Sequence, residues 1–282
     1  MSLIKGITIE EIKKIFSNNR IKRNYLEILS NSITIDVKNL HTDDLDNVIV
    51  GTWEYHKSKQ IIRDLFLASE KYENNRNSGS KITALMDEWD EMRLGKFDWP
   101  FKPKMFDQYV HSINRRPLTE KEKDEAVAID AIKYRRIKDI NAQRNDYIEY
   151  LIFKNNDNII PTFTNKRGVD FYINGEPFDQ KVSRSVGKNF IDEYGEDYRE
   201  IAIQRPDLVA KCLYKYQDEE RFGFEPRLLI VYLDSDLEIE DIENSLVEVN
   251  FNNPINLEFD YRHSDGRIIT YKTYCYIVLV HK

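Results

Sequence analysis

The chain has 282 residues, of which 41% are hydrophobic and 32% are charged, and its formal net charge is −7. This length and ordinary composition predict a fully globular chain with a sizeable core and exclude a disordered or low-complexity protein. The negative charge argues against a passive, nonspecific nucleic-acid binder, because affinity for the phosphate backbone comes mainly from Lys and Arg.

The sequence lacks the marks of a secreted or membrane protein. No apolar run is long enough to span a bilayer, and Met1–Gly6 has no apolar core of the kind that a signal peptide needs. Cys212 and Cys275 have no metal-ligand spacing and are too few for a disulfide framework. We therefore expect a soluble, cytoplasmic protein with no membrane partner.

The first part of the chain, residues 1–118, predicts a mainly helical region. A capping box at Thr8–Glu11 opens a short helix, and a strand-like run follows at Ile33–Val37. Further helical patterns lie at 25–30, about 58–73 and about 80–93, with a loop at Asn74–Gly79. Three prolines within 95–118 favour extended backbone, so we place the domain boundary there. This region is a candidate DNA-contacting part.

Residues 119–282 predict a catalytic α/β domain. A second capping box at Thr119–Glu122 opens the longest helix, about 120–153, with candidate breaks at Asn141 and Asn145. A helix about 205–217 begins near Pro206, and the apolar run Leu228–Leu233 is typical of a buried central strand. The remaining predicted elements are a helix at 239–247 and strands at Leu257–Arg262 and Ile268–Val280.

A hairpin is predicted around Asn174-Gly175, because both central residues of a type I′ turn need positive φ. The flanking strand-like runs are Gly168–Ile173 and Glu176–Ser183. Counting back from the turn pairs Ile173 with Glu176 and Phe171 with Phe178, and sets Asp170 opposite Asp179.

The opposed aspartates predict a cation site. Directly opposed side chains lie about 4.5–5.5 Å apart between Cβ atoms, and like charges so placed repel each other. Lys181 stands two residues after Asp179 and therefore points to the same face of the strand. Two carboxylates beside an ammonium form a hard-oxygen site of the kind that holds Mg²⁺.

This arrangement resembles a known signature. Asp170, eight intervening residues and then Asp179-Gln180-Lys181 resemble the active-site motif of the PD-(D/E)XK nuclease superfamily, with Val169 where the name has Pro. The resemblance covers about residues 145–235. It implies a restriction-endonuclease-like core, a mixed central sheet flanked by helices in the order αβββαβ. The predicted order of long helix, hairpin, helix and buried strand agrees with that core.

The resemblance also implies roles for these residues. Asp170 and Asp179 would bind Mg²⁺, for which Mn²⁺ could substitute, with the backbone carbonyl of Gln180 as a third oxygen. Lys181 would orient the attacking water or neutralise the developing charge. Glu149, on the preceding helix, is the candidate for a further metal ligand and catalytic residue. The alternative reading of Glu149 is a solvent-facing helix charge.

DNA contacts are expected from basic segments near the motif. Five basic residues lie between Lys166 and Lys188, against three acidic ones. The candidate DNA-binding residues of this strip are Arg167, Ser183, Arg184 and Lys188. A second basic cluster lies on the preceding helix, where solvation is the alternative to phosphate contact; its members are Lys133, Arg135, Arg136, Lys138 and Arg144.

Two alternatives to the motif stay open. Asp36-Val37-Lys38, at the end of a strand-like run, is a rival Asp-x-Lys triplet, with Glu27 nine positions upstream. The hairpin around Asn174 could also be an ordinary amphipathic one, with its phenylalanines and valines buried and its charged residues solvated.

The interpretation that follows is a Mg²⁺-dependent, sequence-specific endonuclease for double-stranded DNA, a type II restriction enzyme. We expect a homodimer, because cutting both strands of a palindrome requires two sites related by two-fold symmetry. A cognate DNA methyltransferase would be its partner in the cell. The alternatives are a nuclease of the same fold in repair, recombination or phage defence, and a non-catalytic DNA-binding module.

Overall fold

The computed structural model describes residues 2–282 except 103–104, 165–167, 220–221, 235–236 and 248. The chain forms two compact units, one of residues 1–73 with 151–282 and the other of residues 74–150. The boundary predicted near residue 118 falls inside the second unit, between helices α6 (Phe106–Asn114) and α7 (Glu120–Asn155). The functional division into a DNA-contacting and a catalytic part stays a prediction.

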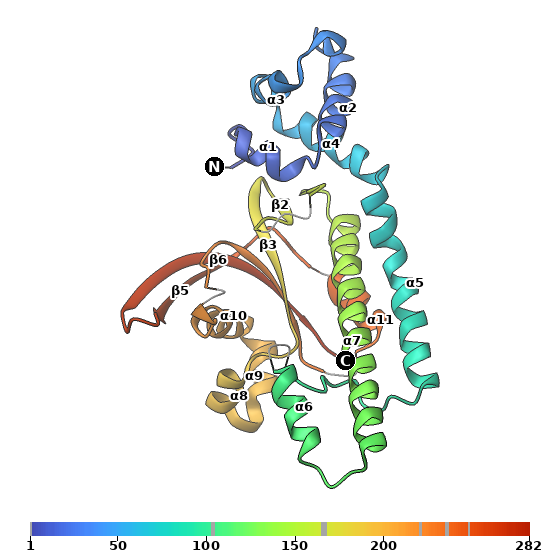
Figure 1. Cartoon of the computed structure of the whole chain (residues 1–282). Coiled ribbons are helices and arrows are strands. Elements are labelled where there is room, and N and C mark those ends of the chain that lie inside the picture. The colour runs from blue at the N-terminus through green and yellow to red at the C-terminus, as the bar shows by residue number, and fades with distance from the viewer. Residues whose placement is uncertain (1, 103–104, 165–167, 220–221, 235–236, 248) are drawn as a thin grey trace. The chain divides into compact units, whose positions relative to one another are not determined.

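The first unit contains a mixed sheet of six strands in the order β1-β2-β3-β4-β6-β5. The strands are β1 (Ile159–Pro161), β2 (Phe171–Ile173), β3 (Glu176–Ser183), β4 (Arg227–Tyr232), β5 (Ile255–Arg262) and β6 (Ile268–Val280). The β3–β4 and β4–β6 pairs are parallel, and the other three pairs are antiparallel. Every residue of β4 is buried, as its apolar run predicted. In Figure 1, β5 and β6 form a long curved hairpin.

Helices flank this sheet. Three of them, α8 (Lys188–Tyr194), α9 (Tyr198–Gln204) and α10 (Pro206–Lys215), follow β3 in the chain, with the 3₁₀ turn η3 (Gly195–Asp197) between α8 and α9. They share a core with the sheet, in which Val209 and Tyr214 of α10 pack near Leu229 of β4 and Phe259 of β5. Helix α11 (Ile239–Val247) contacts β6. The chain is thus mixed α/β, as predicted, with the motif hairpin inside the sheet.

The N-terminal part of the first unit is helical, as predicted. Its helices are α1 (Ile9–Ile15), α2 (Asn19–Ser30), α3 (Leu45–Thr52) and α4 (Tyr55–Leu67), with 3₁₀ turns η1 (Val37–Asn39) and η2 (Thr42–Asp44). The Thr8 capping box of α1 is confirmed, with both reciprocal hydrogen bonds present. The strand predicted at Ile33–Val37 is wrong. None of these residues forms a strand or pairs with a strand in the described ranges, and Arg23 instead donates to the carbonyls of Val37 and Leu40, at 3.2 and 3.0 Å.

The second unit is built from α6 and the greater parts of α5 (Glu70–Glu91) and α7. The loop predicted at Asn74–Gly79 is wrong, because α5 runs through it. Its small polar residues face α7, where Ser78 Oγ donates to Gln143 Oε1 at 2.8 Å. The break predicted near Asn141 or Asn145 is also wrong. Asn141 bonds back to the carbonyl of Ile137 at 2.6 Å, and the helix continues.

No helix among the described residues combines the length and the apolar character that crossing a membrane requires.

The N-terminal helices of the first unit pack on the end of the sheet that carries the motif hairpin. Their apolar core includes Phe163 and Tyr172, which come from the β1–β2 region. The Leu3 N–H donates to the Gly175 carbonyl at 2.8 Å, and the Phe163 N–H donates to the Ile15 carbonyl at 2.7 Å. In Figure 1, α1 accordingly lies beside the hairpin of β2 and β3. These contacts hold the turn of the hairpin in place.

We expect Gly175→Ala to lower the free energy of unfolding by roughly 2 kcal/mol, because an added Cβ meets both strain and a clash. Gly175 has a φ of 83°, and its Cβ would lie 2.7 Å from Ile4 Cγ1 and 3.1 Å from the Ile4 nitrogen. Urea unfolding measures the change. Gly266→Ala is the matched control, because Gly266 has a φ of 86° and nothing within 4 Å of its Cβ position. Equal losses in both proteins would contradict the clash.

Candidate active site

The two predicted aspartates lie where β3 changes its pairing partner. The β2–β3 ladder runs from Ile173↔Glu176 to Phe171↔Phe178 and ends there. The β3–β4 ladder begins at Asp179↔Arg227. The type I′ turn and its register are confirmed, with φ of 52° at Asn174 and 83° at Gly175. Strands β2 and β3 therefore separate at Asp170 and Asp179.

Asp170 is held at this point of separation by its own backbone and side chain. Its N–H donates to the Phe178 carbonyl at 2.9 Å, and its carboxylate Oδ2 accepts the Gln180 N–H at 2.7 Å. Its carbonyl accepts from Thr162 Oγ1 at 3.2 Å. The direct opposition of Asp170 and Asp179 is therefore corrected, since the ladder ends one residue short. The Asp170 carboxylate instead lies against the backbone of Gln180.

Lys181 and Asp179 share one face of β3, as the period of two predicted. Lys181 Nζ lies 2.7 Å from Asp179 Oδ2. The aspartate side chain is 16% exposed and the lysine side chain 53% exposed. The amine is thus accessible from solvent while the carboxylate is largely covered. An ion pair with a half-exposed lysine contributes little to stability, so we consider what the pair could do chemically.

The donor set suits a hard divalent cation. Carboxylate oxygens are the preferred ligands of Mg²⁺, and a carboxylate that accepts one N–H keeps further lone-pair sites. The N–H and C=O of a strand residue point to the same edge, so the Gln180 carbonyl faces the side on which the Asp170 carboxylate lies. Within the described ranges, no group of three or more His, Cys, Asp or Glu is placed to hold a metal ion. The oxygens that these residues could offer a cation are those of the Asp170 and Asp179 carboxylates and of the Gln180 carbonyl.

The site contains an arginine that sequence reasoning missed. Arg227 begins β4, is the Cα partner of Asp179, and is buried. Its Nη1 donates to Gln217 Oε1 at 2.7 Å, and its Cζ lies 5.0 Å from the centre of the Tyr214 ring. Burial raises the pKa of the Tyr214 hydroxyl, Arg227 acts to lower it, and Asp179 acts to raise it. No local sequence signal pairs Arg227 with Asp179, because the register of parallel strands far apart in the chain cannot be counted.

The other predicted site residues are distributed as follows. Glu149 lies on α7 in the second unit, where its Oε2 accepts from Asn75 Nδ2 at 3.2 Å; its place at the metal stays a prediction. Ser183 ends β3 and donates to the Ser185 carbonyl at 2.7 Å. Arg184 and Lys188 are exposed. Arg167 lies outside the described residues.

The basic cluster predicted on the long helix is largely engaged within the second unit. Arg136 lies 2.6 Å from Glu88, and Arg135 lies 3.7 Å from Asp139. Lys138 lies over the ring of Tyr134, and Arg144 lies over that of Phe97. Lys133 approaches Asp130 at 4.0 Å. Each of these basic side chains thus has a partner within the second unit. Contact with DNA phosphates stays a prediction.

The rival triplet Asp36-Val37-Lys38 does not lie on a strand, as a PD-(D/E)XK-like motif would require. Asp36 precedes the 3₁₀ turn η1, and its carboxylate accepts from Asn39 Nδ2 at 2.6 Å. It is not on a strand, and no strand among the described residues pairs with this segment to bring a second carboxylate beside it. Within the described part of the chain, the Asp179 triplet is the Asp/Glu-x-Lys that stands on a strand.

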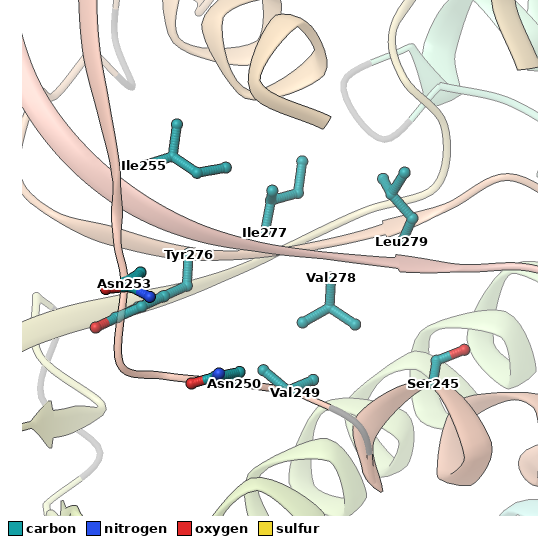
Figure 2. A pocket seen from close by; sticks show the side chains of 9 residues that line it. All are labelled: Ser245, Val249, Asn250, Asn253, Ile255, Tyr276, Ile277, Val278 and Leu279. Atoms are coloured by element: carbon teal, nitrogen blue, oxygen red, sulfur yellow. The ribbon is translucent and has the colours of Figure 1, made fainter. Parts of the chain in front are cut away.

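A pocket of about 290 Å³ lies elsewhere in the first unit, beside the end of β6 and the start of β5. Figure 2 shows its lining, which is made of aliphatic side chains, Asn250, Asn253, Ser245 and Tyr276. The hydroxyl of Tyr276 already donates to the Phe251 carbonyl at 2.8 Å. The described residues that line the pocket include no carboxylate, lysine, arginine, histidine or cysteine, so we assign it no chemistry.

Comparison of the chain with models of protein families, with curated proteins and with solved structures gives no match.

Proposed function

We propose that the protein is a Mg²⁺-dependent endonuclease for double-stranded DNA with a PD-(D/E)XK-like active site. The observations that support this proposal lie where the β2–β3 ladder ends. There, the Asp170 carboxylate lies on the Gln180 backbone, and the Lys181 amine lies 2.7 Å from Asp179. Carboxylates that bind a cation, with an amine nearby, are what metal-assisted phosphodiester hydrolysis requires.

The order of elements around this point supports the same proposal. Helix α7 precedes β1, β2 and β3, three helices follow, and β4 then pairs in parallel with β3. This sequence of elements agrees with the αβββαβ order that the resemblance implies. It sets the motif on a central strand, where the β2 ladder ends at Phe178 and the β4 ladder covers Asp179–Ser183. A rigid scaffold of this kind holds reacting groups in place.

Each residue of the candidate site has a task in this proposal. Asp170, Asp179 and the Gln180 carbonyl would hold the Mg²⁺, and Mn²⁺ would suit the same oxygens. The bound cation supplies Lewis-acid polarisation of the phosphate and lowers the pKa of an attacking water. The Lys181 amine, which is exposed beside Asp179, would orient that water or neutralise the charge that develops on the phosphate.

The proposal includes a type II restriction role, with a homodimer acting on a palindrome and a cognate methyltransferase protecting the host. A two-fold symmetric pair of sites supplies one active site for each DNA strand. A repair, recombination or phage-defence nuclease would use the same site on a branched or single-stranded substrate. A non-catalytic DNA-binding module would bind DNA and need no cation.

Incubation of unmethylated phage DNA with the protein and Mg²⁺ tests the proposal. We expect discrete fragments that vanish with a chelator, and sequencing of their ends then gives the cut site. A smear in place of discrete fragments favours the repair or recombination role. If neither Mg²⁺ nor Mn²⁺ supports cleavage, and neither Mg²⁺ nor Ca²⁺ raises the melting temperature, the enzyme proposal is wrong, because a real site is stabilised by mass action.

A further inference from the structure

Arg227 occupies an unusual position for a cation. It is only 8% exposed, although it lies at the first position of β4 and directly beside Asp179 in the parallel ladder. Neighbouring strands lie about 4.8 Å apart, and paired residues project to the same face. The Asp179 carboxylate is therefore flanked by the Lys181 amine on its own strand and by Arg227 on the next strand.

The guanidinium of Arg227 is held in a fixed orientation. Gln217 accepts from its Nη1 at 2.7 Å, and the ring of Tyr214 lies beneath its Cζ at 5.0 Å. Gln217 is itself fixed, because its Nε2 donates to the carbonyls of Tyr214 and Gly223 at 2.8 and 3.0 Å. A planar guanidinium that is already held in one orientation loses little conformational entropy when it binds a ligand.

This orientation leaves hydrogen-bonding capacity unused. The buried Nε of Arg227 has no hydrogen-bond partner, and no hydrogen bond from Nη2 is found within the described residues. Nor does a described carboxylate lie within 4.0 Å of this guanidinium. Glu225 is close to this guanidinium but outside ion-pair distance, since its Oε2 and the Arg227 Nη2 lie 2.5 and 2.9 Å from the Cβ position of Gly223. A buried guanidinium without a close counter-ion costs free energy, and an anion that reached Nη2 would offset that cost.

We infer that Arg227 binds a backbone phosphate of the DNA next to the scissile bond. Guanidinium groups donate parallel N–H bonds to phosphate oxygens, and their fixed geometry suits the phosphate groups that recur along the DNA backbone. The two aspartates would repel a phosphate, so a cation on each side of Asp179 offsets that repulsion at the place where the substrate must approach. This inference rests on the proposed function, because it assumes that the site acts on DNA.

Binding of random-sequence duplex DNA in Ca²⁺, measured by fluorescence anisotropy over a range of NaCl concentrations, tests the inference. Each phosphate contact contributes about 0.9 to the slope of log affinity against log salt. We expect Arg227→Gln to reduce that slope by about 0.9 and to bind roughly tenfold more weakly at moderate salt. Arg227→Lys should keep the slope, because it keeps the charge. It should bind DNA more weakly, because it loses the planar N–H donors of the guanidinium.

Arg267→Gln is the matched control. Arg267 pairs with Asp265 at the β5–β6 turn, so the variant removes the same charge elsewhere and should keep the wild-type slope. An unchanged slope in Arg227→Gln overturns the inference, as does wild-type protein that does not bind the duplex. If Arg227→Gln does not fold, wild-type affinity in Arg227→Lys overturns it as well.

The two proposals fail separately. If the wild-type protein cleaves DNA but Arg227→Gln keeps the full slope and affinity, only the phosphate contact is wrong. If the wild-type protein cleaves DNA with neither Mg²⁺ nor Mn²⁺ while Arg227→Gln loses slope, the proposed nuclease function is wrong and the phosphate contact stands.

Discussion

An Asp179→Asn protein is expected to cleave DNA at least roughly 10³-fold more slowly than the wild type, because charge stabilisation by a bound cation supplies several kcal/mol. The substitution keeps the shape of the side chain and removes one negative ligand. Asp179 is 16% exposed and pairs with a lysine that is half exposed, so the loss of that ion pair costs little stability. Single-turnover cleavage of phage DNA in Mg²⁺ measures the effect.

The same variant should lose the stabilisation by divalent cations. A ligand at one hundred times its dissociation constant stabilises a folded protein by about 2.7 kcal/mol, so Ca²⁺ should raise the melting temperature of the wild type and not that of Asp179→Asn. Glu258→Gln is the control, because Glu258 is an exposed strand carboxylate that also pairs with a lysine, at 3.1 Å. Full cleavage by Asp179→Asn would remove Asp179 from the metal.

Local patterns predicted the parts of the site that depend on local geometry. The Asn174-Gly175 turn fixed the register of the hairpin, and the period of two brought Lys181 onto the face of Asp179. Counting could not foresee that the β2–β3 ladder ends at Phe171↔Phe178, one residue before the aspartates, while β4 pairs with the opposite edge of β3 from Asp179 onward. Asp170 therefore lies against the backbone of Gln180 and not opposite Asp179.

Contacts between segments far apart in the chain determine the secondary structure at the places where the sequence-based prediction was wrong. Asn, Ser and Gly at 74–79 are typical of a loop, yet they form the contact face of α5, where Gly79 allows the ring of Tyr147 to approach closely. An added Cβ at Gly79 would lie 2.8 Å from that ring. Ile33–Val37 has the composition of a strand but pairs with no strand in the part of the chain that the structure describes. The composition of a segment allows several secondary structures, and its tertiary contacts determine which one forms.

A Lys181→Met protein is expected to lose roughly 10²–10⁴-fold in cleavage rate, which is the contribution typical of one positioned proton-transfer or water-orienting group. Methionine keeps the length of the side chain and removes the amine that lies 2.7 Å from Asp179. The lysine is not among the expected metal ligands. The variant should therefore still be stabilised by Ca²⁺, which separates it from Asp179→Asn.

Comparison of the two variants assigns the roles of the residues. Loss of cleavage with retained Ca²⁺ stabilisation in Lys181→Met, and loss of both in Asp179→Asn, assigns the cation to the carboxylate and the chemical step to the amine. Lys272→Met is the matched control, because the exposed side chain of Lys272 on β6 pairs with Glu258 of β5, away from β3. Wild-type cleavage by Lys181→Met would mean that the amine only balances the charge of Asp179, and the water-orienting role would then have to be withdrawn.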